Sequence, residues 1–105
     1  MKDRRHDDAM AELFKEDPKL AAATLDAILA EGDQGELLVT LRQMAKAFGG
    51  VPNIARKADL NATQLYRTLS EEGNPAVSSL SAILRVMGLR LAVLPIKSGD
   101  KPHAH

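Results

Sequence analysis

Several residue types on which particular functions depend are missing or scarce in this chain. Its 105 residues include no cysteine and no tryptophan, and the only aromatic side chains are Phe14, Phe48 and Tyr66. Without cysteine there can be no disulfide, thiolate metal site or cysteine nucleophile, and such a composition is typical of the reduced cytoplasm. The scarcity of aromatics argues against a large aromatic-lined pocket and favours an aliphatic core between helices.

Signals for a membrane protein and for an enzyme are absent as well. No apolar run approaches the ~20 residues of a membrane span, and residues 1–8 are polar and of mixed charge, unlike a signal peptide. His6, His103 and His105 lie near the chain ends, where no pocket is expected to gather them, and the sequence has neither a phosphate-binding glycine loop nor HExxH. We therefore expect a cytoplasmic protein that is not an enzyme and has no metal and no cofactor.

The formal net charge is zero, but the charges are distributed unevenly. Residues 1–36 carry five Lys and Arg against ten Asp and Glu, residues 37–70 carry five against one, and the remainder carries four against three. An acidic first third beside a basic middle predicts two surfaces with different partners. The alternative is chance segregation of charge on solvated helix faces.

The helical spacing of apolar residues predicts a mainly α-helical chain. The expected helices are 8–15 (one or two turns), 18–31, 33–48, 52–58, 62–70 and a last one ending at Met87. The residues expected to cap helix starts are Asp17, Asp33, Asn61, and Ser78 or Ser79, and those expected to end helices are Gly32, Gly49-Gly50 and Gly88. The helices on either side of Gly32 would form an N-terminal helical hairpin.

The segment Leu89–Ile96 (LRLAVLPI) is rich in β-forming residues and predicts one short C-terminal β-strand. A lone strand cannot satisfy its own backbone, so pairing with the same segment of a second copy would give a homodimer. The alternative is a segment that lies extended over the core. The expected organisation is an N-terminal arm (1–17), a single helical domain (18–96) and a flexible tail (97–105).

Residues 50–70 are expected to form a helix-turn-helix, because two short helices flank the three-residue corner Asp59-Leu60-Asn61. Apolar residues stand where the two helices must contact each other, namely Ile54, Ala55, Ala58, Leu60, Leu65 and Leu69. Asn61 and Gln64 fit a capping box, in which each side chain bonds the backbone N–H of the other.

Side chains left off this core are candidates for contact with DNA. Those at the start of the second helix would enter the major groove and read base edges: Ala62, Thr63, Gln64 and Arg67. Others are better placed for phosphates: Asn53, Arg56, Lys57 and Tyr66. Thr63 and Arg67 are the strongest candidates, because the amide of Gln64 is expected to be engaged in the cap. The alternative is that these cations form an ordinary solvated face.

The motifs LYRTLS (65–70), GNP (73–75) and VMGLRLAV (86–93), in this order, resemble the addiction-module antidote family, small antitoxins similar to the HigA group. The resemblance covers about residues 18–95, including the helical stretch AAATLDAILAEGDQGELLVTLRQMAKAFGG. It implies a lambda-repressor-like (XRE) helix-turn-helix bundle. The implied function is a sequence-specific repressor that binds operator DNA of its own operon as a dimer and neutralises a small RelE/ParE-like toxin.

Two residues depart from the family pattern. Asp59 stands where the corner usually has Gly; it tolerates the left-handed conformation but places a negative charge near phosphate. Pro52 stands where a small polar residue is usual, and it removes one backbone N–H that could hold a phosphate. Two alternatives remain open at this point: a protein-binding module in which the helix-turn-helix is only scaffold, and a stand-alone repressor without a toxin partner.

Overall fold

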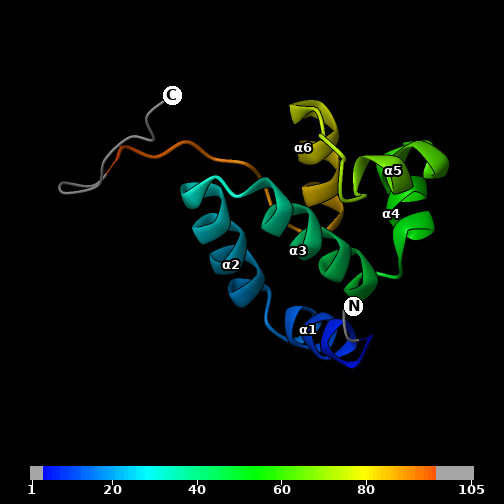
Figure 1. The fold of residues 1–105 in the computed structure, drawn as a ribbon, viewed down its shortest axis with the longest axis horizontal. Helices are drawn as coiled ribbons and strands as arrows, with labels where there is room; N and C mark the ends of the chain where they lie inside the picture. Colours follow the sequence, from blue (N-terminus) through cyan, green and yellow to red (C-terminus); the bar gives the residue numbers. More distant parts are fainter. Residues whose placement is uncertain (1–3, 97–105) are drawn as a thin grey trace.

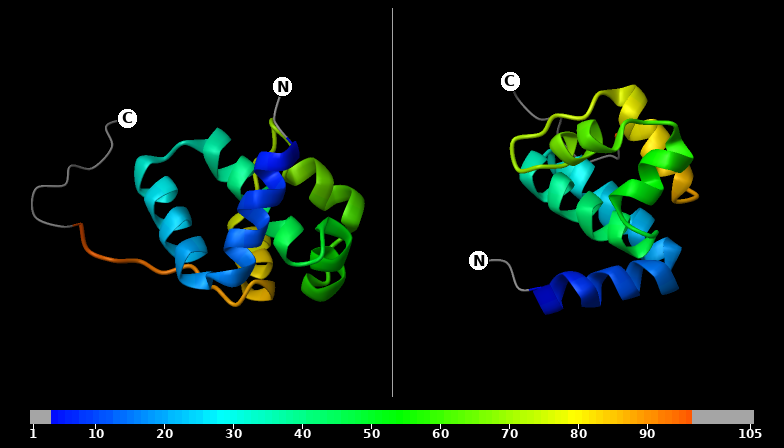
Figure 2. Two further views of the ribbon diagram at one scale, coloured as in Figure 1. Left: turned by 90° about the horizontal axis from the view of Figure 1, so that it is seen from below. Right: turned by 90° about the vertical axis from the view of Figure 1, so that its right-hand side faces the viewer.

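The computed structural model describes residues 4–96, with side chains from His6 onward, and this part of the chain is mainly α-helical, as predicted. The helices are α1 (Arg4–Glu16), α2 (Pro18–Glu31), α3 (Gln34–Ala47), α4 (Val51–Ala58), α5 (Ala62–Thr68) and α6 (Val77–Val86) (Figure 1). Figure 2 shows α1 on one side of the α2–α3 hairpin and α6 on the other. None of these helices is long and apolar enough to cross a membrane.

The local capping signals of the helical hairpin are confirmed. Asp17 is the N-cap of α2, and its carboxylate accepts the N–H of Leu20 at 3.1 Å. Asp33 is the N-cap of α3, and its carboxylate accepts the N–H of Glu36 at 3.0 Å. Gly32 ends α2 in the left-handed region with φ 79°, and its N–H donates to the carbonyl of Ile28. These contacts satisfy backbone groups that a helix end otherwise leaves unpaired.

Helix α3 forms the centre of the core. The largest fully buried side chains come from α1, α3, α4, α6 and the end of α5, and they are Phe14, Leu38, Leu41, Met44, Ile54, Leu69 and Ile83. Three of the seven belong to α3, which packs against α1 and α2 on one side and α4 on the other. The aliphatic core expected from the composition is therefore present.

Helix α1 is longer than the one or two turns predicted over 8–15. Phe14 is fully buried, and two polar contacts join α1 to α3: Gln43 donates to Asp7 at 3.1 Å, and Lys46 forms an ion pair with Asp8. Packing against a partner extends helices beyond what their own sequence supports, which explains the extra turn at the N-terminal end.

Two predictions for the C-terminal part are wrong. Helix α6 begins at Val77 after Ala76, without a side-chain cap, so neither Ser78 nor Ser79 caps it. Within residues 4–96 there is no β-strand; the segment 89–96 is extended without a paired neighbour. Strand structure needs a second backbone at hydrogen-bonding distance, and this part of the chain supplies none.

The alternative stated for this segment, an extended path over the core, describes only its first half. Leu89 and Leu91 pack partly against the core, whereas Val93, Leu94 and Ile96 are 97%, 73% and 60% exposed. The predicted flexible tail (97–105), with His103 and His105, lies outside the described residues.

Gly73, in the turn between α5 and α6, has no room for a side chain. A Cβ on this residue would lie 1.8 Å from the carbonyl oxygen of Thr68, a clash with backbone that no rotamer can relieve. We expect Gly73→Ala to lower the free energy of unfolding by at least about 2 kcal/mol, measured by urea denaturation.

The matched control for this change is Gly32→Ala. A Cβ on Gly32 meets nothing within 4 Å, although its φ of +79° favours glycine. We expect a loss of about 1 kcal/mol there, from backbone strain alone. An equal or larger loss at Gly32 would contradict a steric role for Gly73.

Candidate nucleic-acid interface

Helices α4 and α5 are joined by the three-residue corner predicted from the sequence. Asp59 follows α4 in the left-handed region at φ 57°, ψ 46°, and it is the one non-glycine residue with positive φ in the described part of the chain. The N–H of Leu60 then bonds the carbonyl of Ala55 at 2.8 Å, which closes α4. Asn61 begins α5, and its side chain accepts the N–H of Gln64 at 2.9 Å. The corner therefore tolerates aspartate, as expected.

The contact between the two helices is apolar. Ile54 and Ala55 of α4 and Leu65 of α5 are buried, as is Leu69 at the end of α5. Leu60 is partly buried against the same core. Because alanine at position 55 extends no further than Cβ, the second helix can pack closely there. The two helices thus present their remaining side chains outward from a rigid base.

The far end of α5 is fixed to α3 by a contact that the sequence did not reveal. The half-buried guanidinium of Arg42 donates to the carbonyl of Leu69, and the hydroxyl of Ser70 donates to the carbonyl of Arg67 at 2.7 Å. A cation at the C-terminal end of a helix is favourable for the helix dipole as well. Arg42 therefore positions α5 and does not belong to the exposed basic surface.

Arg42 and Lys46 were counted in the basic middle of the chain, but both lie on α3 and are already engaged, Arg42 with the carbonyl of Leu69 at the end of α5. Lys46 pairs with Asp8 of α1. The exposed cations of the two-helix unit are Arg56, Lys57 and Arg67. The local excess of positive charge on α4 and α5 is therefore smaller than the count along the sequence implies, but it is concentrated on these two helices.

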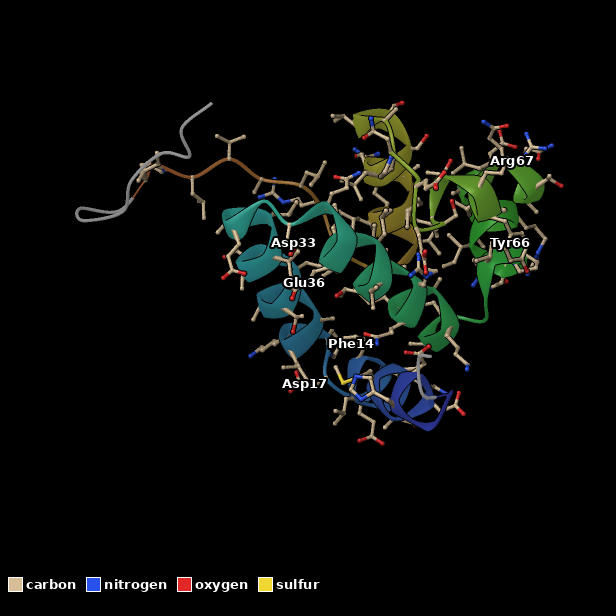
Figure 3. All side chains as sticks on the ribbon, in the orientation of Figure 1. Phe14, Asp17, Asp33, Glu36, Tyr66 and Arg67 are labelled. Atoms are coloured by element: carbon tan, nitrogen blue, oxygen red, sulfur yellow. The ribbon has the colours of Figure 1, made fainter. Side chains whose placement is uncertain are left out.

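The predicted base-reading residues differ in their exposure to solvent. Thr63, Gln64 and Arg67 are exposed on α5, whereas Ala62 is half-buried against the core. In Figure 3, Tyr66 and Arg67 stand at the end of the molecule opposite Asp33 and Glu36. Three polar side chains of α5 are thus free to meet a partner on a face without acidic neighbours from the helical hairpin.

The amide of Gln64 is not engaged in the cap. Among the hydrogen bonds of residues 4–96, Gln64 contributes its backbone N–H to Asn61, but its side chain makes no return contact. Only half of the expected capping box is formed. The exposed amide is therefore available for a bidentate contact. Gln64 was ranked below Thr63 because its amide was expected to be engaged, and that reason no longer holds.

The predicted phosphate-contacting residues also differ in their exposure to solvent. Arg56 and Lys57 are exposed, and Tyr66 is 56% exposed. Asn53 is half-buried; its amide donates to the carbonyl of Phe48 at 2.7 Å and its oxygen accepts from Arg56. Asn53 thus closes the end of α3 and orients Arg56, and has little capacity left for a phosphate.

This candidate interface carries groups that are suited to recognition of nucleic acid. Hydroxyl, amide, phenol and guanidinium groups stand on its surface, all of which bind nucleic acid in proteins. Among the described residues, no three His, Asp or Glu side chains gather in a way that could hold a metal ion.

Comparison with known proteins agrees with the motifs of the sequence. Residues 6–95 match the family model described as "Probable addiction module antidote protein". Because the match covers most of the 105 residues, the chain belongs to this family. No significant match was found among curated proteins or solved structures. The family resemblance inferred from LYRTLS, GNP and VMGLRLAV is therefore confirmed.

The cap at Asn61 supplies a test of how α5 is held. Asn61→Ala removes the oxygen that accepts the N–H of Gln64, and we expect the free energy of unfolding to fall by about 1 kcal/mol. Asn61→Ser keeps an acceptor and should cost only a fraction of this. Urea denaturation measures both, and equal losses would show that the cap does not stabilise α5.

Proposed function

We propose that this protein is a sequence-specific DNA-binding repressor of its own operon and the antidote of a small toxin. The observation that carries the DNA-binding part is the exposed polar and cationic surface of α4 and α5. The apolar side chains of the same two helices are buried in the core and hold this surface in place. Membership of the antidote family supports the toxin as a partner in general. Its proposed role is binding and not catalysis.

In this proposal α5 is the reading helix of a helix-turn-helix. Thr63, Gln64 and Arg67 read base edges in the major groove, because a hydroxyl, an amide and a guanidinium match the donor and acceptor patterns there. Ala62 allows close approach and offers an apolar contact to a thymine methyl. Its half-buried position limits it to that role.

Register and affinity come from phosphate contacts. We assign these to the exposed Arg56, Lys57 and Tyr66, with Asn53 orienting Arg56. Asp59 carries a negative charge beside this set and weakens non-specific attraction to the DNA backbone. Discrimination between sequences would then depend more on the reading residues of α5.

Operator binding requires a dimer if the site is a pair of half-sites, as it is for most helix-turn-helix repressors. The apolar segment after α6 offers the surface: Val93, Leu94 and Ile96 are largely exposed. Leu94 also lines an apolar groove of about 230 Å³ between α2, α6 and this segment. The same segment thus supplies both projecting side chains and part of the groove, which suits an isologous contact between two copies.

Arg67 supplies the first test of the reading surface. Arg67→Ala removes a guanidinium that would bond a guanine or a phosphate, and we expect specific binding to weaken by about 1–3 kcal/mol at fixed salt. The measurement is a fluorescence anisotropy titration with the DNA upstream of the gene and, in parallel, with a scrambled duplex.

The matched control is Lys19→Ala, which removes an exposed cation of α2 that lies outside both the apolar groove and the α4–α5 surface. It should change specific and scrambled binding only slightly and equally. Equal effects of the two substitutions would remove Arg67 from the reading set. If the wild-type protein does not distinguish the two duplexes, the repressor proposal fails, and the alternative of a protein-binding module is favoured.

The dimer is tested at Leu94. Leu94→Glu places a charge on the apolar surface, and we expect the protein to change from dimer to monomer at micromolar concentration in sedimentation equilibrium. Leu13→Glu is the control, because Leu13 is 47% exposed on α1 and lies outside this surface. A monomeric wild type, or equal dissociation by both substitutions, would contradict the assignment.

A further inference from the structure

A second surface lies on the other side of α3 and has no part in the proposed DNA contact. It is an open groove of about 910 Å³ between α1, α2 and α3. Apolar side chains from α2 and α3, including Ala27, Ile28 and Val39, line it together with the exposed carboxylates of Glu31 and Glu36. Among the described residues that line it, none is Lys or Arg, and His6 is the one side chain that can become cationic.

We propose that this groove receives a basic amphipathic helix of the partner toxin, an inference that rests on the proposed antidote function. The apolar lining would take the hydrophobic face of such a helix, and the two carboxylates would pair with Lys or Arg beside that face. This assigns the neutralising contact to α1–α3 and separates it from the DNA contact on α4 and α5.

Charge decides between the possible occupants. Nucleic acid is disfavoured because its phosphates would face the carboxylates of Glu31 and Glu36. A second copy that docked through the same surface is disfavoured on the same ground, since it would present the same two carboxylates. A basic protein surface is the partner whose charge the groove complements.

Shape decides in favour of a helix. An added β-strand would need an exposed sheet edge, and residues 4–96 contain no strand to provide one. The groove walls are helices, whose ridges and furrows accept another helix.

The test uses the full chain and, as the probe, the purified product of the reading frame directly beside its gene. Calorimetry at about 0.15 M salt compares wild type with Glu31→Lys/Glu36→Lys, which we expect to weaken binding at least 10-fold. The matched control is Glu12→Lys/Glu16→Lys: both residues are exposed on α1 and outside the groove, and the net charge changes equally. It should weaken binding less than about 3-fold.

A second pair of variants tests the apolar lining. Ala27→Arg fills the groove with a bulky cation, whereas Ala23→Arg places the same side chain on an exposed position of α2 that does not line it. We expect a loss of at least 10-fold only for the first. Urea denaturation checks that every variant is folded, and operator binding should be unchanged in all four.

The outcomes separate this inference from the function on which it rests. If wild type binds the probe and the groove variants bind equally well, or no worse than their controls, the groove is not the docking site. If wild type does not bind the probe, the proposed toxin neutralisation fails and the groove assignment with it. Operator binding by wild type reports independently on the repressor function.

Discussion

The burial of α3 on both sides is the constraint on which the rest of the structure depends. Leu38, Leu41 and Met44 are fully buried, so α1 and α2 can pack on one side of this helix while α4 packs on the other. Polar residues of α3 complete the arrangement, since Gln43 bonds α1 and Arg42 bonds the end of α5. The two candidate surfaces are therefore held apart by a single rigid element.

Features that depend on local chemistry could be predicted from the sequence. An N-cap needs only a suitable oxygen and the N–H three residues later, so Asp17, Asp33 and Asn61 were identified correctly. The corner at Asp59 follows in the same way, because its conformation is set by the end of α4 and by the start of α5. The candidate reading residues were selected by their spacing from the apolar contacts of these two helices.

Features that depend on distant residues could not be predicted. The role of Arg42 requires knowing that the end of α5 lies beside α3, twenty-seven positions away along the chain. The full length of α1 depends on packing against α3, and Ser78 and Ser79 resembled caps only because α6 was expected to begin later. The segment 89–96 has strand-forming residues, but strand structure requires a partner backbone, and residues 4–96 supply none.

A net charge of zero does not count against a DNA partner in a molecule of this shape. Charges interact over about 8 Å at physiological ionic strength, whereas the shortest extent of the molecule is 27 Å. A phosphate at α4 and α5 would therefore respond to Arg56, Lys57 and Arg67, and to Asp59 beside them, and little to Asp33 and Glu36 at the opposite end of the molecule (Figure 3). By the same reasoning, a basic partner at Glu31 and Glu36 is little affected by these cations, so the proposed DNA and toxin contacts can form on one chain together.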